Sequence, residues 1–351
     1  MGIPDWAPNV HPAIVHFPIA LFIIGFVADL IALTGFRRVQ MRRFSSTMYI
    51  LAGVTTVATF FSGEQASDSV LPSAEANPVL TEHSDLGHYM LWFGVVYAVL
   101  RIADLVLVRN DKLSIYVPLV VLGAAGCYLL YETAEHGAEL VYKHGVGVVA
   151  AAEASSISIP LPSSGSDAGI NVSANGSWSW AANHPATWKD GFEWLAGSPD
   201  SIEASLVSRP DGRLVLSLTL TDADVLFVAG KPLPGVQVDA EWNLDYFDGT
   251  AALVHNLTAA DNYHYVEFGN GVMSQGRVQS GQVAPFDTQA WSLEGWHVVR
   301  AVGHGTHFRG YAGGRLVTHG HGPAADAGRV GLRLRGSGKV QLSGVVVSAL
   351  E

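Results

Sequence analysis

Hydrophobic and polar positions follow two different patterns, one on each side of residue 148. Before it, four long apolar runs contain few charged residues, and each approaches the ~20 residues that cross the hydrocarbon core of a bilayer. They predict four transmembrane helices, at about 12–35, 45–61, 85–108 and 115–136. Because short loops connect these helices, we expect an antiparallel bundle over residues 1–148.

After residue 148 the apolar positions recur with a period of two. Small residues and two prolines in the segment 149–169 predict a linker. Residues 170–351 consist of short alternating runs bounded by Gly, Asp and Asn, which predict many antiparallel strands. The expected fold class is therefore α+β multidomain: a four-helix transmembrane bundle followed by an all-β jelly-roll sandwich.

The distribution of basic residues predicts how the bundle is oriented. Two of the three loops contain Arg or Lys, at positions Arg37, Arg38, Arg42, Arg43, Arg109 and Lys112. The third loop, 63–84, is acidic and contains neither. Because basic loops stay in the cytoplasm, we expect a bacterial inner-membrane protein with both termini in the periplasm. The start, MGIPDWAPNV, lacks the basic region of a signal peptide, so we expect the first apolar run to be retained.

Charge and cysteine content narrow the classes of partner. The net charge of -11 argues against a nucleic-acid partner, since such binding relies on clustered Lys and Arg. The single cysteine, Cys127, excludes an intrachain disulfide and a CxxCH haem-attachment motif. We expect the partners to be the lipid bilayer and other membrane subunits.

Six histidines fall at the predicted outer end of the bundle. Three of them have similar predicted depths and are our first choice for a ligand site: His16, His88 and His136. The others are alternative ligands or partners that orient the ligands: His11, His83 and His144. Converging imidazoles can ligate haem iron or a transition metal. They can also hold helices together by hydrogen bonds alone, so haem b, a transition metal and no cofactor all remain open.

Three charged residues fall at matching depth in the predicted inner half of the bundle. Asp29 lies about two turns before the first basic loop, and Arg101 about two turns before Arg109. Because isolated charges are costly in lipid, we expect an intramembrane Asp29–Arg101 ion pair, assisted by Asp104. A structural clamp is favoured over a proton path, which needs further titratable groups through the bundle.

Three strings carry a resemblance to a known family: HPAIVHFPIAL, HSDLGH and EHGAELVYKHGVGV. They are similar to the marks of a bacterial four-helix family described as predicted membrane proteins of unknown function. The resemblance covers about residues 9–150, and Ala138 stands where a second glycine is usual. Members are sometimes fused to, or encoded beside, c-type cytochrome modules, so the resemblance implies company in electron transport. It supplies no established catalytic residues.

The last third resembles concanavalin/laminin-G-like jelly rolls, particularly the family that includes 3-keto-disaccharide hydrolases. The strings VQVDAEWNLDYFDGTAALVHN and GWHVVRAVGHGTHFRGYAGGRLV carry this resemblance, which covers about residues 200–351. This fold hosts lectins, hydrolases and inert spacers alike. Its carboxylates include Glu241, Asp245, Asp248 and Glu267, but no spacing singles out a catalytic pair, so we do not expect an enzyme.

Two further groups in this region allow alternative interpretations. One is a set of histidines on a single predicted hairpin, which can bind a metal or form a polar outer face: His304, His307, His319 and His321. The other is a set of tryptophans, which can stack on sugars or fill the core: Trp178, Trp180, Trp188 and Trp194. Glycan contact by the jelly roll therefore stays open.

Three hypotheses for the function follow from these patterns. The first is an integral membrane subunit or accessory of an electron-transport complex, whose outer histidine cluster binds haem b or a metal. The second is a cofactor-free structural subunit that braces a larger assembly, such as a photosynthetic reaction centre or a respiratory complex. The third is a membrane-tethered carbohydrate-binding domain.

Overall fold

The computed structural model describes residues 9–107, 113–148, 169–209, 211–292 and 294–350. The chain divides into two compact units, a helical unit of Met1–Val70 with Val79–Val148, and a second unit of Leu71–Pro78 with Val149–Glu351. Of the predicted linker, residues 149–168 lie outside the described residues, as do Arg109 and Lys112.

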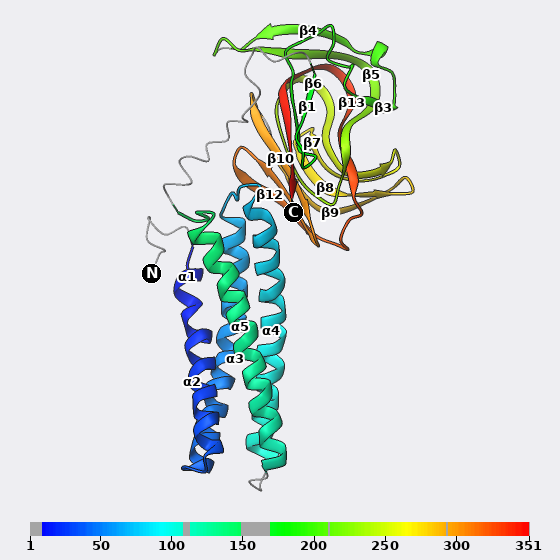
Figure 1. Cartoon of the computed structure of the whole chain (residues 1–351). Coiled ribbons are helices and arrows are strands. Elements are labelled where there is room, and N and C mark those ends of the chain that lie inside the picture. Colours follow the sequence, from blue (N-terminus) through cyan, green and yellow to red (C-terminus); the bar gives the residue numbers. More distant parts are fainter. Residues whose placement is uncertain (1–8, 108–112, 149–168, 210, 293, 351) are drawn as a thin grey trace. The chain divides into compact units, whose positions relative to one another are not determined.

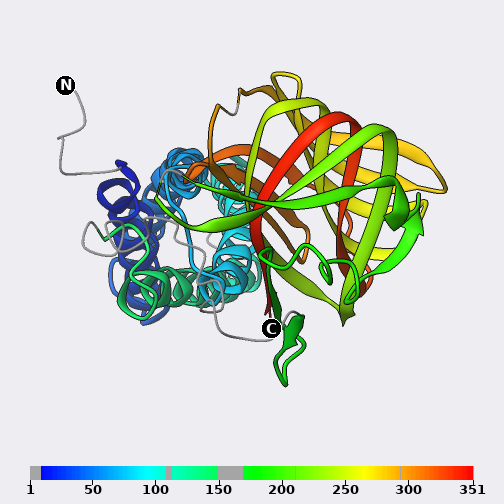
Figure 2. The ribbon, with the colours of Figure 1, turned by 90° about the horizontal axis from the view of Figure 1, so that it is seen from above.

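The helical unit contains four helical spans that are long and apolar enough to cross a membrane. The helices are α1 (His11–Ile14), α2 (His16–Leu33), α3 (Arg38–Asp68), α4 (Ala76–Leu107) and α5 (Leu113–Tyr142) (Figure 1). The short α1 and α2 together form the first span, His11–Leu33. Seen nearly along their axes in Figure 2, the spans surround a common centre.

Several helices extend beyond the boundaries that hydropathy predicts. α3 begins at Arg38 rather than near 45 and ends at Asp68 rather than near 61. α4 begins at Ala76 rather than near 85. Hydropathy marks the length in contact with lipid, whereas a helix continues until its backbone is capped or broken. Pro72 follows the end of α3, and Pro78 lies in the first turn of α4, where its missing N–H costs nothing.

The bundle core combines aromatic residues with closely approaching small ones. Phe22, Tyr49 and Tyr97 are among its buried members. At Gly53 on α3, an added Cβ would lie 2.7 Å from Cβ of Ala98 on α4. Small residues at such a crossing let two backbones approach closely, which is how helices pack without a hydrophobic driving force.

The second unit is an antiparallel β-sandwich. Its strands are β1 (Ile170–Val172), β2 (Trp178–Ala181), β3 (Glu193–Ala196), β4 (Glu203–Ser208), β5 (Leu214–Leu233), β6 (Gly235–Ala259), β7 (Asn262–Gly269), β8 (Val272–Gln279), β9 (Gln282–Ala290), β10 (His297–His304), β11 (His307–Ala312), β12 (Arg315–His321) and β13 (Gly328–Leu350). One layer has the order β1-β2-β13-β6-β10-β11-β12. In the other, β5, β13, β6, β7, β8 and β9 pair in turn, and β3 and β4 pair with β5.

The long strands β6 and β13 belong to both layers, and the main core lies between them. Alternate residues of these strands, such as Val236, Val238 and Ala240 on β6, belong to this core, as period-two patterning requires. Trp178, Trp180 and Trp188 are buried in this core, and Trp194 packs against it. The tryptophans therefore fill the sandwich interior. The predicted fold class, helices followed by a jelly-roll sandwich, is confirmed.

Candidate functional site

A buried ion pair joins Asp29 on α2 to Arg101 on α4, and neither side chain is accessible to solvent. Nη2 of Arg101 donates to Oδ2 of Asp29, and Nη1 donates to Oδ1 at 3.2 Å. The carboxylate and the guanidinium thus meet in the bidentate arrangement, which is the strongest geometry for this pair of groups.

Hydroxyl groups from three helices, α3, α4 and α5, surround this pair. Ser45 on α3 and Tyr116 on α5 both donate to Oδ1 of Asp29, Tyr116 at 2.7 Å. The hydroxyl of Tyr97, one turn before Arg101 on α4, accepts hydrogen bonds from its Nε at 3.0 Å and its Nη2 at 2.5 Å. All four spans therefore contribute to one buried polar network, which we call the clamp.

Close packing holds the clamp in place. Tyr97 donates its hydroxyl proton to the carbonyl oxygen of Leu119 at 2.7 Å. Cζ of Arg101 lies 4.5 Å from the ring centroid of Tyr49, within the range of a cation–π interaction. An added Cβ at Gly123 would lie 2.6 Å from the Tyr49 hydroxyl oxygen. Glycine at this position thus lets α5 approach the network closely.

Asp104 has a different partner from the one that the sequence predicts. Instead of assisting the Asp29–Arg101 pair, its carboxylate pairs with Arg42, whose Nε donates to Oδ2 at 2.9 Å. The reason is that α3 begins at Arg38, so Arg42 belongs to a helix and is buried rather than lying in a basic loop. Asp29 is thus neutralised by Arg101, and Asp104 is neutralised by Arg42.

Two of the predicted outer histidines, His11 and His83, lie close together. Their ring centroids are 6.5 Å apart, with the ring planes at 82°. Nδ1 of His11 lies 3.2 Å from the carbonyl oxygen of Thr59 and 3.1 Å from Oγ of Ser62. Nδ1 of His83 lies 2.9 Å from the carbonyl oxygen of Thr133. Each imidazole therefore contacts the backbone of another span, α3 for His11 and α5 for His83.

His136 lies near the end of α5 among carboxylates. Its Nε2 is 3.1 Å from Oε2 of Glu82 on α4, and its Nδ1 is 3.7 Å from Oε2 of Glu135. Glu132, Glu135 and His136 each offer a ligand atom, and these atoms lie within 4.8 Å of one another. This group can hold a metal ion, with oxygen as the main donor.

The other predicted histidines do not join such a group. His16 is exposed on α2, and the ring of His88 packs edge-on against Phe60 at 4.6 Å between centroids. Nε2 of His144 lies 3.7 Å from a carboxylate oxygen of Glu139. Within the described ranges, the groups of three or more potential ligands include none of these histidines. Position along a helix sets depth, but helix rotation decides which way a side chain faces.

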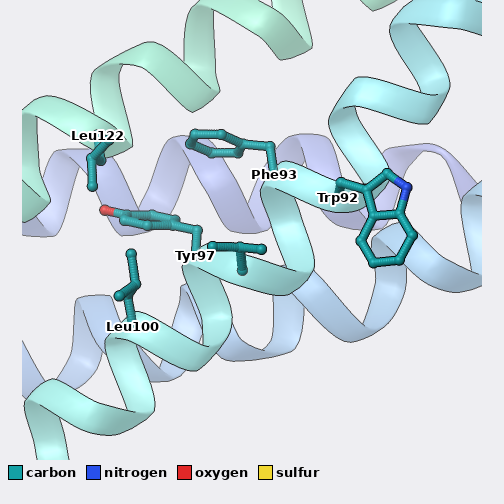
Figure 3. Close-up of a pocket in the computed structure, with 6 residues that line it drawn as sticks. Trp92, Phe93, Tyr97, Leu100 and Leu122 are labelled. Carbon is teal, nitrogen blue, oxygen red and sulfur yellow. The ribbon is translucent and has the colours of Figure 1, made fainter.

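An apolar groove opens on the outside of α4 and has a volume of about 320 Å³. It is lined by Trp92, Phe93, Val96, Tyr97, Leu100 and Leu122. Figure 3 shows the ring of Tyr97 between Leu100 and Leu122. Because Tyr97 also binds Arg101, the groove ends on a residue of the clamp.

In the sandwich, carboxylates that the sequence offers for glycosidase chemistry are engaged in other contacts. Oε1 of Glu241 lies 2.8 Å from Nη1 of Arg209. Oδ1 of Asp245 accepts the backbone N–H of Gly295 at 2.8 Å. Both carboxylates are thus engaged in contacts within the sandwich.

A buried histidine pair in the sandwich is a feature that sequence analysis does not identify. His255 on β6 is fully buried and stacks on His264 of the neighbouring β7, with 5.7 Å between centroids. Burial lowers the pKa of His255 to about 4, although its hydrogen bond with Asn256 opposes the shift. Burial, followed by the nearby His255 and Arg277, lowers the pKa of His264 to about 3. The sequence signal that could have identified this pair is that both histidines lie in alternating runs, which predict strands.

The four hairpin histidines lie on three strands rather than on a single two-stranded hairpin. His304 ends β10, His307 begins β11, and His319 and His321 lie on β12. His307, His319 and His321 form the second group of potential metal ligands in the described part of the chain.

These features define an integral membrane protein with four candidate spans and a β-sandwich domain. Residues 7–150 match a family model described as "Predicted membrane protein (DUF2231)". The helical region thus belongs to this predicted membrane protein family, and the resemblance suggested by the three sequence strings is confirmed. Comparison with curated proteins gives no match.

Solved structures similar to this chain align with its sandwich. A carbohydrate-binding module, CBM66 from Bacillus subtilis, has 13% identity and a TM-score of 0.37, covering 45% of this chain and 96% of that chain. Bacillus licheniformis β-glucanase has 8% identity and a TM-score of 0.37, covering 50% and 99%. The Caenorhabditis elegans galectin LEC-6 has 11% identity and a TM-score of 0.28, covering 44% and 99%. The domain resembles the galectin- and glucanase-like jelly rolls.

Proposed function

We propose that this protein is a structural subunit of a larger bacterial membrane assembly, such as a respiratory complex or a photosynthetic reaction centre. The observation that supports this proposal is the clamp, in which buried charged side chains of different helices bind one another. Such a network makes the four spans a rigid unit, on which other membrane subunits can pack. The sandwich then serves as a contact domain on the outer side of the membrane.

The bundle core supports a static role over a conducting one. Along α2, Phe22 lies between the outer histidines and Asp29. Met90 on α4 and Leu130 on α5 occupy the same intermediate stretch of their helices. A proton path from the outer histidines to the clamp would need titratable groups or water in this apolar layer. The clamp therefore acts within the proposed subunit as a lock between helices.

The proposed orientation follows the basic residues. Arg37 lies in the turn between α2 and α3, and Arg43 lies in the first turns of α3, at the end of the bundle that the positive-inside rule assigns to the cytoplasmic side. Both termini, and with them the sandwich, are then periplasmic. Two separate fusions after the last residue test this assignment, one with alkaline phosphatase and one with green fluorescent protein. Active phosphatase and dark fluorescent protein are expected, and the opposite pair of results contradicts the orientation.

The scaffold role is tested on the full chain extracted from its native membrane in polymer nanodiscs. We expect the protein to migrate with a larger complex at fixed stoichiometry across independent preparations. After detachment from the complex, its reduced-minus-oxidised absorption spectrum should show no haem bands. Migration as a monomer in native membranes, or a haem that is lost in His16→Ala and His88→Ala, contradicts the proposal.

One observation favours a second function, a redox or metal-binding role at the outer end. His136 lies within reach of three carboxylate side chains, and the His11 and His83 rings are neighbours. Metal analysis of the purified protein tests this alternative. A stoichiometric metal that disappears in His136→Ala and persists in His16→Ala supports it. A metal content that is the same in the wild type and in His136→Ala, after purification in buffers supplied with zinc and iron, contradicts it.

A further inference from the structure

The strand register brings three histidines of the sandwich to one face. His307 on β11 lies directly opposite His321 on β12, and Arg309 lies opposite His319. Residues that lie opposite each other on antiparallel strands project to the same side, as do residues two apart on one strand. His319 and His321 therefore share the face of His307. We call these three residues the histidine triad.

The side chains of the triad converge. The ring centroids of His307 and His321 are 4.5 Å apart, and those of His319 and His321 are 4.7 Å apart. Each histidine offers one ring nitrogen, and these nitrogens all lie within 4.8 Å of one another. Small rotations about the side-chain bonds suffice to bring three nitrogens at this separation onto one ion at the ~2.0–2.1 Å typical of zinc–nitrogen bonds.

The chemistry of the donors selects the class of ligand. Neutral imidazole nitrogens suit zinc, copper and nickel, whereas magnesium and calcium prefer oxygen ligands. Three protein ligands leave a fourth position of a tetrahedral ion for water or for a group from a partner. His321 is exposed and His319 half-buried, so an ion can enter from solvent on their side.

Two charged residues near the triad act in opposite directions. Nη2 of Arg309 lies 3.5 Å from Nδ1 of His307, and its positive charge weakens cation binding. Oδ2 of Asp287 accepts the backbone N–H of His319 at 3.1 Å, which brings a compensating carboxylate to the same strand end. His304 lies opposite His307 on β10, so a fourth imidazole is on the same face.

We propose that the histidine triad binds a divalent transition-metal ion, with zinc as the expected occupant. This site is independent of the scaffold role, because it uses residues of the sandwich alone. It is also distinct from the Glu132–Glu135–His136 group of the helical unit, which is richer in oxygen donors.

The test uses cobalt as a spectroscopic substitute for zinc, on the full chain in detergent and without a polyhistidine tag. We expect one equivalent of Co²⁺ to produce the intense visible bands of tetrahedral coordination, which Zn²⁺ then displaces. Removing a residue that only hydrogen-bonds to a metal ligand costs about 10–100-fold in metal affinity. Removing a ligand itself, in His319→Ala or His321→Ala, should therefore lower the affinity for Co²⁺ at least about tenfold.

Two matched controls make the result specific. His184→Ala removes an exposed histidine of the sandwich, and His136→Ala removes the histidine of the other group. Both should keep the cobalt bands, and thermal unfolding of the metal-free variants should match the wild type. Wild-type protein without tetrahedral bands overturns the proposal, as do bands that survive both triad substitutions or vanish in His136→Ala.

Discussion

Replacing Arg101 by Met tests whether the clamp holds the bundle together. The variant removes both hydrogen bonds to Asp29, both hydrogen bonds to the Tyr97 hydroxyl and the cation–π contact with Tyr49. Asp29 keeps only the hydroxyl hydrogen bonds described above and becomes a buried charge without its counter-ion. Removing one partner of a buried pair costs about 3–5 kcal/mol, which raises the unfolded fraction of the bundle by more than about 100-fold.

The chain provides its own probe for this measurement. Cys127 is the single cysteine, is half-buried on α5 and lies against the bundle core. The rate at which a thiol reagent labels it in detergent therefore reports opening of the bundle, independently of the sandwich. We expect labelling to accelerate strongly in Arg101→Met. Arg43→Met is the control, because Arg43 is exposed. The free energy of opening that its labelling rate gives should stay within about 0.5 kcal/mol of the wild-type value.

A double variant separates the charge from the packing. Combining Asp29→Leu with Arg101→Met removes both charges, so the penalty of a lone buried carboxylate disappears. Replacing a buried pair by apolar residues is often neutral or stabilising, and we therefore expect the double variant to be more stable than Arg101→Met. If Arg101→Met labels like Arg43→Met, or if the two substitutions add without coupling, the clamp does not lock the helices.

Three further predictions concern packing, hydrogen bonding and pH. Gly123→Ala should destabilise the bundle by about 1–3 kcal/mol because its Cβ meets the Tyr49 hydroxyl. Gly87→Ala is the control, since Gly87 has open space around it, and it should not destabilise the bundle. Cys127 labelling measures the effect of both substitutions. Tyr116→Phe removes one hydrogen bond to a carboxylate and should cost about 1.5–3 kcal/mol in the same assay, an effect near zero arguing against that bond. The pKa of His255 is lowered to about 4 from an unfolded value of 6.5, so the unfolded chain binds the extra proton between these values. His255 alone should therefore cost the sandwich roughly 3 kcal/mol as the pH falls through this window, and the lowered pKa of His264 adds to the loss; tryptophan fluorescence during denaturant unfolding measures it. His255→Asn should flatten this dependence relative to the exposed control His184→Asn, and an unchanged slope would contradict the buried neutral state.

Local pattern was sufficient to predict the fold class. Four apolar runs of membrane length and a period-two region are properties of short stretches, because the bilayer and the sandwich core each impose a direct requirement on consecutive residues. Depth counting along the helices also placed Asp29 and Arg101 at one level, and the structure pairs them.

Tertiary structure decided which side chains meet. Asp104 binds Arg42 because α3 extends into a stretch that hydropathy assigns to a loop. His16 and His88 sit in the expected helices, yet their direction depends on how each helix rotates against its neighbours. The histidine triad depends on strand register, since a shift of one residue would turn His307 to the opposite face from its partners. Helix rotation and strand register are set by contacts between segments that lie far apart in the sequence. The sequence therefore supplies the candidate residues, and the tertiary fold decides which of them meet in the clamp and in the histidine triad.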